Sequence, residues 1–391
     1  MNIYNRALEL FEETVTHRRW FHTHAEVGLN MPQAKIYVIN TLRSYGITAT
    51  ECGHGIMATI GKGDKTILLR ADMDALPMKE ESGLDFACPT GTEAHTCGHD
   101  FHAAMLLTAA KILKENESEL RGVVKLMFQP AEEILKGAKD MITHGILEHP
   151  KPDSALAFHV TSGNTPIGMF YYNNVNPMMH SVDNFKITIH GKGTHGAYPH
   201  KGVDPINIGV HIHLALQELI ARETDSEHAS ILTVGHFEGG TTGNVIPDTA
   251  VLEGALRTNH KETRIYLLKR LQEITITTAE AFQGTANIEF LSEIPPLECN
   301  PKLTTEFVSY LHELPIPHLQ EVRNMTASAS EDFALIAEQI PSTMIYLSAG
   351  FPDKRGSYPA HNPQVQFNED VCPIGVAAYA YCAIEWLRRH N

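Results

Sequence analysis

The alternation of apolar segments along the chain constrains its fold more than any other feature of the sequence. Up to residue 181, short apolar runs rich in β-branched residues alternate with helical patterns. The runs cover residues 57–60, 66–71, 123–128 and 155–160, and the clearest buried helix covers residues 101–113. Strands that alternate with helices predict an α/β fold with a mostly parallel sheet covered on both faces.

The pattern changes near residue 182, where Phe185, Ile187 and Ile189 alternate with polar neighbours as in a half-buried strand. Further elements follow in the order helix, strand, strand, helix, strand, at residues 205–222, 231–237, 250–257, 262–282 and 286–291. This order is that of a ferredoxin-like α+β unit. After Pro295-Pro296 an apolar strand (343–349) and a helix (371–387) resume the first pattern. We therefore predict a larger domain, residues 1–181 and 297–391, interrupted by a smaller inserted domain, residues 182–296.

Charge and composition exclude several classes of function. The 391-residue chain carries 46 acidic and 31 basic residues, a formal net charge of −15. A nucleic-acid binder would show a basic surplus, and an acidic chain is repelled by anionic lipid. The sequence also shows no apolar segment long enough to span a membrane, no signal-peptide pattern in residues 1–20, and six cysteines without a CxxC pair. We predict a soluble, cytoplasmic protein that binds neither nucleic acid nor membranes.

Two clusters of side chains could carry chemistry. Cys97 and His99 flank a glycine directly before the buried helix, so both can face one point. Thiolate and imidazole are ligands suited to Zn²⁺ and similar ions, although such a pair alone also fits a buried cysteine beside a helix-capping loop. Glu132 and Glu133 follow the strand at 123–128, where one could bind a metal and the other act as a general base. Alternatively, both acids could simply begin the next helix.

Single residues elsewhere join these clusters at the same predicted edge of the sheet. His159 closes the strand at 155–160, Asp72 and Asp74 follow the strand at 66–71, and His361 lies in a loop. Because ligands of parallel sheets gather outside the carboxyl ends of the strands, we expect these side chains to converge.

The residues resemble the M20 metallopeptidase family, and within it the amidohydrolase branch of hippurate hydrolases, auxin-conjugate hydrolases and N-acetyldiaminopimelate deacetylases. The resemblance runs nearly end to end. It is carried by RADMDALPM (70–78), HTCGHDFHAAML (95–106), FQPAEE (128–133), FHV around His159, GTHGAYPH (193–200), GGTTGNVIPD (239–248), SEDFA (330–334) and the His361 loop.

The resemblance implies a site with two divalent metal ions in the larger, catalytic domain. Zn²⁺ or Mn²⁺ is expected there, and Co²⁺ and Ni²⁺ are also compatible with such ligands. The implied ligands are Cys97, which bridges the two ions, with His99, Glu133, His159 and His361. Glu132 would be the general base, and Asp72 or alternatively Asp74 would orient a ligand. His95 and His102 would flank the site without binding metal.

The inserted domain is expected, from the same resemblance, to act as a lid and a dimerisation surface, giving a homodimer or homotetramer. It would supply His195 and Asn244 to substrate binding, and His195 could stabilise an oxyanion. The loop at 239–244 and Arg257 are candidates for binding a substrate carboxylate.

The function that these features favour is hydrolysis of N-acyl-L-amino acids, hippurate-like or N-acetylated, to a carboxylate and a free amino acid. The alternatives are a dipeptidase or carboxypeptidase, an N-acetyldiaminopimelate-type deacetylase, and a scaffold protein without activity.

Two departures from the family pattern bear on substrate and ligands. Asp72 replaces a histidine ligand of the broader family, and Ile134-Leu135-Lys136 stands where many relatives carry glycines.

Overall fold

The computed structural model describes residues 2–317 and 319–391, and these divide into two compact units. The first unit consists of Met1–Met178, Glu298–Thr326 and Leu335–Asn391. The second consists of Met179–Leu297 and Ala327–Ala334. The predicted insertion, residues 182–296, lies inside the second unit, which also takes in the eight residues from 327 to 334. The helices of the described residues include none that is both long and apolar enough to cross a membrane.

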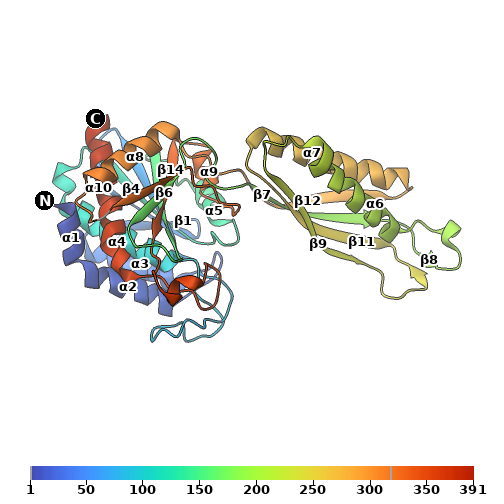
Figure 1. Ribbon diagram of the computed structural model, residues 1–391, viewed down its shortest axis with the longest axis horizontal. Helices are drawn as coiled ribbons and strands as arrows, with labels where there is room; N and C mark the ends of the chain where they lie inside the picture. Colours follow the sequence, from blue (N-terminus) through green and yellow to red (C-terminus); the bar gives the residue numbers. More distant parts are fainter. Residues whose placement is uncertain (1, 318) are drawn as a thin grey trace. The chain divides into compact units, whose positions relative to one another are not determined.

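The first unit is built on a sheet that has eight strands within the described residues, in the order β1-β2-β4-β3-β5-β14-β6-β13 (Figure 1). The strands are β1 (Ala49–Cys52), β2 (Gly55–Lys62), β3 (Thr66–Asp72), β4 (Gly122–Gln129), β5 (Ser154–Thr161), β6 (Met169–Tyr172), β13 (Gln320–Arg323) and β14 (Ser342–Ser348). The central strands β4, β3, β5 and β14 run parallel, and antiparallel pairs join β1 to β2, β2 to β4 and β14 to β6. The predicted α/β fold with a mostly parallel sheet is confirmed.

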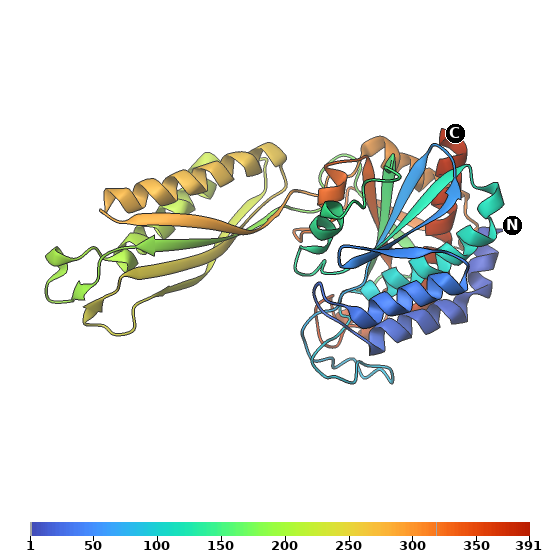
Figure 2. The ribbon, with the colours of Figure 1, turned by 180° about the vertical axis from the view of Figure 1, so that it is seen from behind.

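Helices cover one face of this sheet as a continuous layer (Figures 1 and 2). They are α1 (Ile3–Glu9), α2 (Phe11–Thr23), α3 (Pro32–Ser44), α4 (His99–Glu115), α8 (Pro301–Glu313) and α10 (Cys372–His390). On the other face, α5 (Gly137–Thr143) and the turn after it lie against β1 and β4, where the buried Lys125 ammonium donates to the Glu148 and Pro150 carbonyls. The strands β3, β4 and β14 are buried along their whole length, as expected for parallel strands between two layers.

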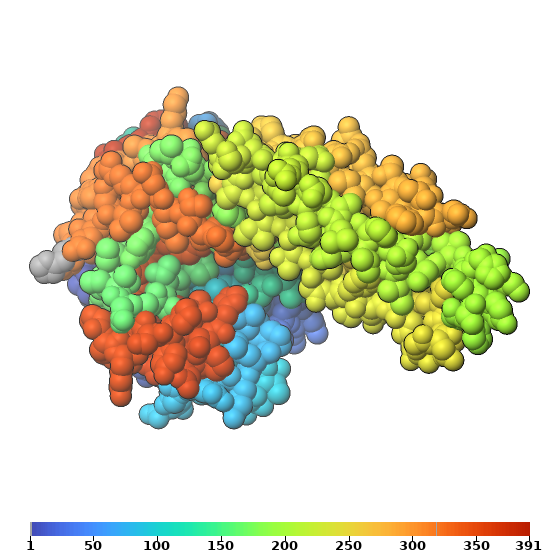
Figure 3. Space-filling model, turned by 45° about the vertical axis from the view of Figure 1, so that its right-hand side comes forward, coloured from blue at the N-terminus to red at the C-terminus, as the bar shows by residue number. Residues whose placement is uncertain are grey.

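The second unit is an antiparallel sheet with two helices on one face. Its sheet order is β12-β7-β11-β9, which is the 4-1-3-2 order of a ferredoxin-like unit, so that prediction is confirmed. The elements are β7 (Val182–His190), β8 (Thr194–His195), α6 (Pro205–Glu218), β9 (Ser230–Gly239), β10 (Val245–Ile246), β11 (Thr249–Thr258), α7 (Lys261–Ala281) and β12 (Thr285–Ile294). Phe185, Ile187 and Ile189 pack with Ile212 of α6 and Leu271 of α7 in its core. Figure 3 shows this unit in green to amber as a space-filling surface.

A single hydroxyl joins two strands of the large sheet where they separate. Pairing between β3 and β5 ends at Arg70 and Ala157. Beyond that point the fully buried Tyr379 of α10 donates its hydroxyl to the Arg70 carbonyl (2.7 Å) and accepts from the Phe158 N–H (3.2 Å). The hydroxyl therefore completes hydrogen bonds that the diverging strands cannot make to each other.

Replacing Tyr379 with Phe should lower the free energy of unfolding of the first unit by about 1–3 kcal/mol, because two buried backbone groups lose a partner. Urea denaturation followed by circular dichroism measures this change. The matched control is Tyr381→Phe on the same helix, whose hydroxyl bonds only the half-exposed Glu313 (2.9 Å). Equal effects of the two changes would contradict the role given to Tyr379.

Candidate metal centre

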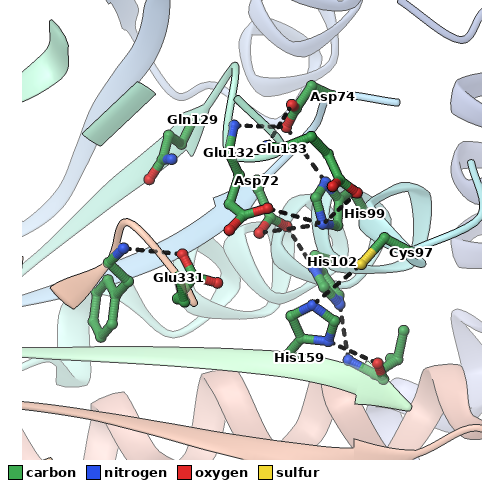
Figure 4. Close-up of polar contacts among 12 residues, drawn as sticks. Asp72, Asp74, Cys97, His99, His102, Gln129, Glu132, Glu133, His159 and Glu331 are labelled. Carbon is green, nitrogen blue, oxygen red and sulfur yellow. Dashed lines mark hydrogen bonds and ion pairs between the residues drawn. The ribbon is translucent and has the colours of Figure 1, made fainter. Parts of the chain in front are cut away.

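The carboxyl ends of three adjacent parallel strands bring the predicted residues of the first unit together (Figure 4). Strand β3 ends at Asp72, β4 ends at Gln129 just before Glu132 and Glu133, and His159 is close to the end of β5. His99 is the first residue of α4, directly after Cys97 and Gly98. Residues far apart in the sequence thus meet at one edge, as the sequence predicted.

The Cys97 thiol lies in two separate groups of potential ligands. It is grouped with His99 and His159, and also with Glu133 and His361, and in each group the donor atoms lie within 4.8 Å of one another. The Cys97 Sγ is 3.6 Å from His159 Nε2, and His361 Nε2 is 3.5 Å from Glu133 Oε1. A ligand that bridges two ions has to belong to two groups of ligands at once, and the Cys97 thiol has this position.

His159 is held in the tautomer that a ligand needs. Its Nδ1 donates to the Val160 carbonyl (2.7 Å), which leaves the lone pair of Nε2 facing Cys97. Burial and the neighbouring His102 keep the pKa of His159 well below its usual value, so the ring stays neutral. A neutral imidazole whose other nitrogen is fixed by a hydrogen bond is well prepared to bind a metal.

The His99 ring lies among carboxylates. Its Nε2 is 3.7 Å from Asp72 Oδ2, and 3.9 Å from both Glu132 Oε2 and Glu133 Oε1. Burial opposes a charge on His99, but Asp72, the Cys97 thiol and Asp74 outweigh it and hold the pKa of His99 well above its usual range. The surroundings of this ring therefore favour a positive charge at this point.

Several atoms of the site that could bind a metal are buried and lack hydrogen bonds. His99 Nε2 and Glu133 Oε1 have no hydrogen-bond partner among residues 2–317 and 319–391. Burial raises the pKa of the Cys97 thiol and of the Glu133 carboxyl, so both need a nearby cation to ionise readily. A soft sulfur ligand, a hard carboxylate ligand, the neutral imidazole of His159 and surplus negative charge fit divalent metal ions of the Zn²⁺ or Mn²⁺ type.

Asp74, the alternative to Asp72 as the residue that orients a ligand, holds the backbone of the two glutamates. Its carboxylate oxygens accept from the backbone N–H groups of Glu132 and Glu133, each at 3.0 Å. One of them also lies 3.3 Å from His99 Nδ1. The spacing R-A-D-M-D places two acids close together after the strand, so the sequence left open which of the two aspartates orients a ligand.

Asp72 has different partners. It pairs with Arg70 (2.6 Å) and with Nδ1 of His102 (2.5 Å), all three fully buried. His102 Nε2 accepts from the Val160 N–H (2.8 Å), so both of its ring nitrogens are occupied and it is not placed to bind a metal.

His95 also lies outside the ligand set. Burial lowers the pKa of His95 to about 3, and His95 belongs to none of the ligand groups found in the described part of the chain.

The loops that bring in the last ligands have unusual backbone conformations. His361 has a φ of +66°, is 53% exposed, and donates its N–H to the Thr96 carbonyl (2.9 Å). Leu135, two residues after Glu133, has a φ of +58° and donates its N–H to the Glu132 carbonyl (2.7 Å). Glycine adopts this left-handed region without strain, so Leu135 and His361 hold conformations that are uncommon for residues with a side chain.

The three remaining predicted residues lie in the second unit. His195 pairs with Val245 between β8 and β10 and is exposed, and its Nδ1 accepts from the Ala197 N–H (3.0 Å). Asn244 is exposed as well, and its carbonyl accepts from the Gly196 N–H (2.8 Å), so both belong to one tip of this unit. Arg257 is on β11 and donates to the Ser330 hydroxyl (2.8 Å).

Comparisons with known proteins identify the family of the chain. The profile of "Peptidase family M20/M25/M40" matches residues 68–385. An N-acetyl-L-cysteine deacetylase of Bacillus subtilis is 36% identical, with 90% of this chain and 83% of that protein covered. The IAA-amino acid hydrolase ILR1-like 2 of Arabidopsis thaliana is 33% identical (97% and 86% covered). Thermostable carboxypeptidase 1 of Saccharolobus solfataricus is 32% identical (98% and 97% covered).

A solved structure supports the same assignment. The Bacillus subtilis YXEP protein, described as a dinuclear metal binding peptidase from the M20 family, is 26% identical and superposes with a TM-score of 0.81. The comparison covers 97% of this chain and 99% of that one. Fold, ligand groups and relatives together lead to one conclusion: the chain belongs to peptidase family M20/M25/M40 and is a hydrolase that acts on amide bonds.

Proposed function

We propose that this hydrolase cleaves the amide bond of N-acyl-L-amino acids to a carboxylate and a free amino acid, with two divalent metal ions per subunit. The observation that carries the proposal is the position of Cys97 in two ligand groups at once, with Glu132 beside them. The deacetylase and IAA-amino acid hydrolase relatives support the substrate class.

Five side chains would hold the ions: Cys97 as the bridge, with His99, Glu133, His159 and His361. Zn²⁺ or Mn²⁺ suits this mixed set, and Co²⁺ and Ni²⁺ are also compatible with it. When bound, such ions polarise an amide carbonyl and lower the pKa of water. Asp74 keeps His99 and Glu133 in place through its carboxylate, and Asp72 acts on the cluster through His102.

Glu132 would move the proton in this reaction. Its backbone is fixed by Asp74, and its carboxylate is 3.9 Å from His99 without belonging to the bridging groups. As a general base, Glu132 takes a proton from the attacking water at a carboxylate oxygen and returns it to the nitrogen of the leaving amino acid. This gives the adjacent acids separate roles.

The second unit would bind substrate. His195 donates a hydrogen bond to the developing oxyanion, Asn244 lies on the same tip, and Arg257 binds the free carboxylate. We further propose that this unit acts as a lid and joins subunits into a homodimer or homotetramer, and that the enzyme is cytoplasmic.

Two alternatives within the family have support of their own. The carboxypeptidase relatives favour peptide substrates. The N-acetyl-L-cysteine deacetylase favours an N-acetyl group, which an N-acetyldiaminopimelate-type deacetylase would also remove. A panel of acetyl-, benzoyl- and longer acyl-amino acids beside dipeptides, assayed after chelation and restoration of each metal, separates them. We expect turnover of N-acyl-amino acids that is lost on chelation. Cleavage of dipeptides alone would contradict the proposal.

Gly98 allows the metal ligands on either side of it to face one point. Its φ is +90°, and an added Cβ would lie 2.3 Å from Val160 Cγ2. Gly98→Ala should displace Cys97 and His99 and lower metal affinity by about tenfold or more, measured as bound metal after dialysis at controlled free-ion concentration. The control is Gly91→Ala, which has a φ of +70° but an empty surrounding. Equal metal content in both variants would contradict this reasoning.

The two adjacent acids give a second test. Glu132→Gln should reduce kcat roughly 10²–10⁴-fold while metal content stays unchanged, because only the proton acceptor is lost. Glu133→Gln should lose metal as well as activity, because a neutral amide is a poorer ligand. Metal analysis and steady-state kinetics on both variants check this. A Glu132→Gln enzyme that turns over normally would refute the role of general base.

A further inference from the structure

A half-buried arginine without an acidic partner lies on the open face of the second unit. Arg257 is on β11, where Leu252 and Leu256 face the helices and the alternate positions face away from them. Burial lowers the pKa of Arg257, and it forms no ion pair with any described residue. Its hydrogen bond goes to the neutral Ser330 hydroxyl (2.8 Å). A guanidinium taken partly out of water without a counter-charge is costly unless an anion is bound there.

His180 lies beside this arginine. The pairing of β7 with β11 continues past Asp183 and Leu256, since the Ser181 N–H donates to the Thr258 carbonyl (2.7 Å) and the Thr258 N–H donates to the Ser181 hydroxyl (3.0 Å). This register sets His180 across from Asn259, on the face that also carries Arg257. The His180 N–H is in turn fixed by the Ala329 carbonyl (3.0 Å), next to Ser330.

The ring of His180 is buried with an unused nitrogen. Its exposed fraction is 5%, and Nδ1 finds no hydrogen-bond partner in residues 2–317 or 319–391. A buried polar atom left without a partner is destabilising, so a ligand that accepts a hydrogen bond from it is favoured. Burial and the charge of Arg257 hold the pKa of His180 below its usual value, so the ring is neutral and can donate from one nitrogen.

We propose that His180 is a specificity residue that donates a hydrogen bond from Nδ1 to the substrate carboxylate bound by Arg257. The arginine supplies the charge and a planar pair of donors, and the histidine supplies a third donor at the side. A carboxylate suits both, because it has four acceptor lone pairs and carries a negative charge opposite to that of Arg257. This inference rests on the proposed function and specifies how the free carboxylate of an N-acyl-amino acid is recognised.

The test compares two substrates that differ only in that group: the N-acyl-L-amino acid that the wild type cleaves best, and the same compound as its carboxamide. His180→Ala should raise KM for the acid about tenfold and change kcat for it less than twofold. KM for the carboxamide should stay within twofold of the wild-type value. His180→Asn should recover most of the affinity, because the amide nitrogen of Asn can occupy the position of Nδ1.

His190→Ala is the matched control, since His190 is on the same strand β7, is exposed, and pairs with Asn287 (3.2 Å). It should leave both KM values unchanged. Two results would overturn the role of His180. One is a well-folded His180→Asn variant that loses affinity for the acid and the carboxamide alike, and the other is a His180→Ala variant that loses affinity for neither. Both results would leave the proposed function intact. A wild type that cleaves no N-acyl-amino acid would instead overturn both.

Discussion

The carboxylate of Asp74 connects the elements on which the metal centre depends. It accepts from the N–H groups of Glu132 and Glu133 and faces Nδ1 of His99, so the end of β3, the loop after β4 and the start of α4 meet at one side chain. Two adjacent glutamates can diverge only if the backbone between them is fixed. Asp74 fixes it, because hydrogen bonds to a charged acceptor are about twice as strong as neutral ones. The separate functions proposed for Glu132 and Glu133 therefore depend on a residue that holds their backbone N–H groups.

The buried charges of the metal centre would lower the stability of the fold if their role were purely structural. Asp72, Glu132 and Glu133 surround His99 in a buried place, and Arg70 pairs with Asp72. Hydrophobic residues would pack there at lower cost, since buried charges rarely repay their desolvation. The arrangement is reasonable for a site that holds cations. The same reasoning applies in the opposite sense to Arg257 and His180, for which the proposed ligand is an anion.

Much of the large sheet and of the site at its edge could be predicted from the sequence, because each strand and the polar residues after it form a local sequence pattern. Strand ends followed by Cys97-Gly98-His99, by Glu132-Glu133 and by His159 had to converge once the sheet was parallel. Asp74 was only an alternative to Asp72, because no pattern shows which of two acids faces a ligand. His180 carried no signal, since its importance comes from register with Asn259 and from burial. The joining of residues 327–334 to the second unit depends on contacts distant in sequence, which periodicity does not reveal.

The order of strands in the large sheet also has a consequence for how the protein is made. Strand β14 pairs with β5 along their whole length, although the entire second sheet lies between them in the chain. On the ribosome, β5 with His159 keeps an open edge until residue 348 has emerged. The four-strand unit has closer partners in sequence and can complete its sheet first. Its early folding brings the two ends of the insertion together and shortens the loop that β14 must close. The pairing of Val182 with Ile294 thus makes the separation of β5 and β14 in space shorter than their separation in sequence.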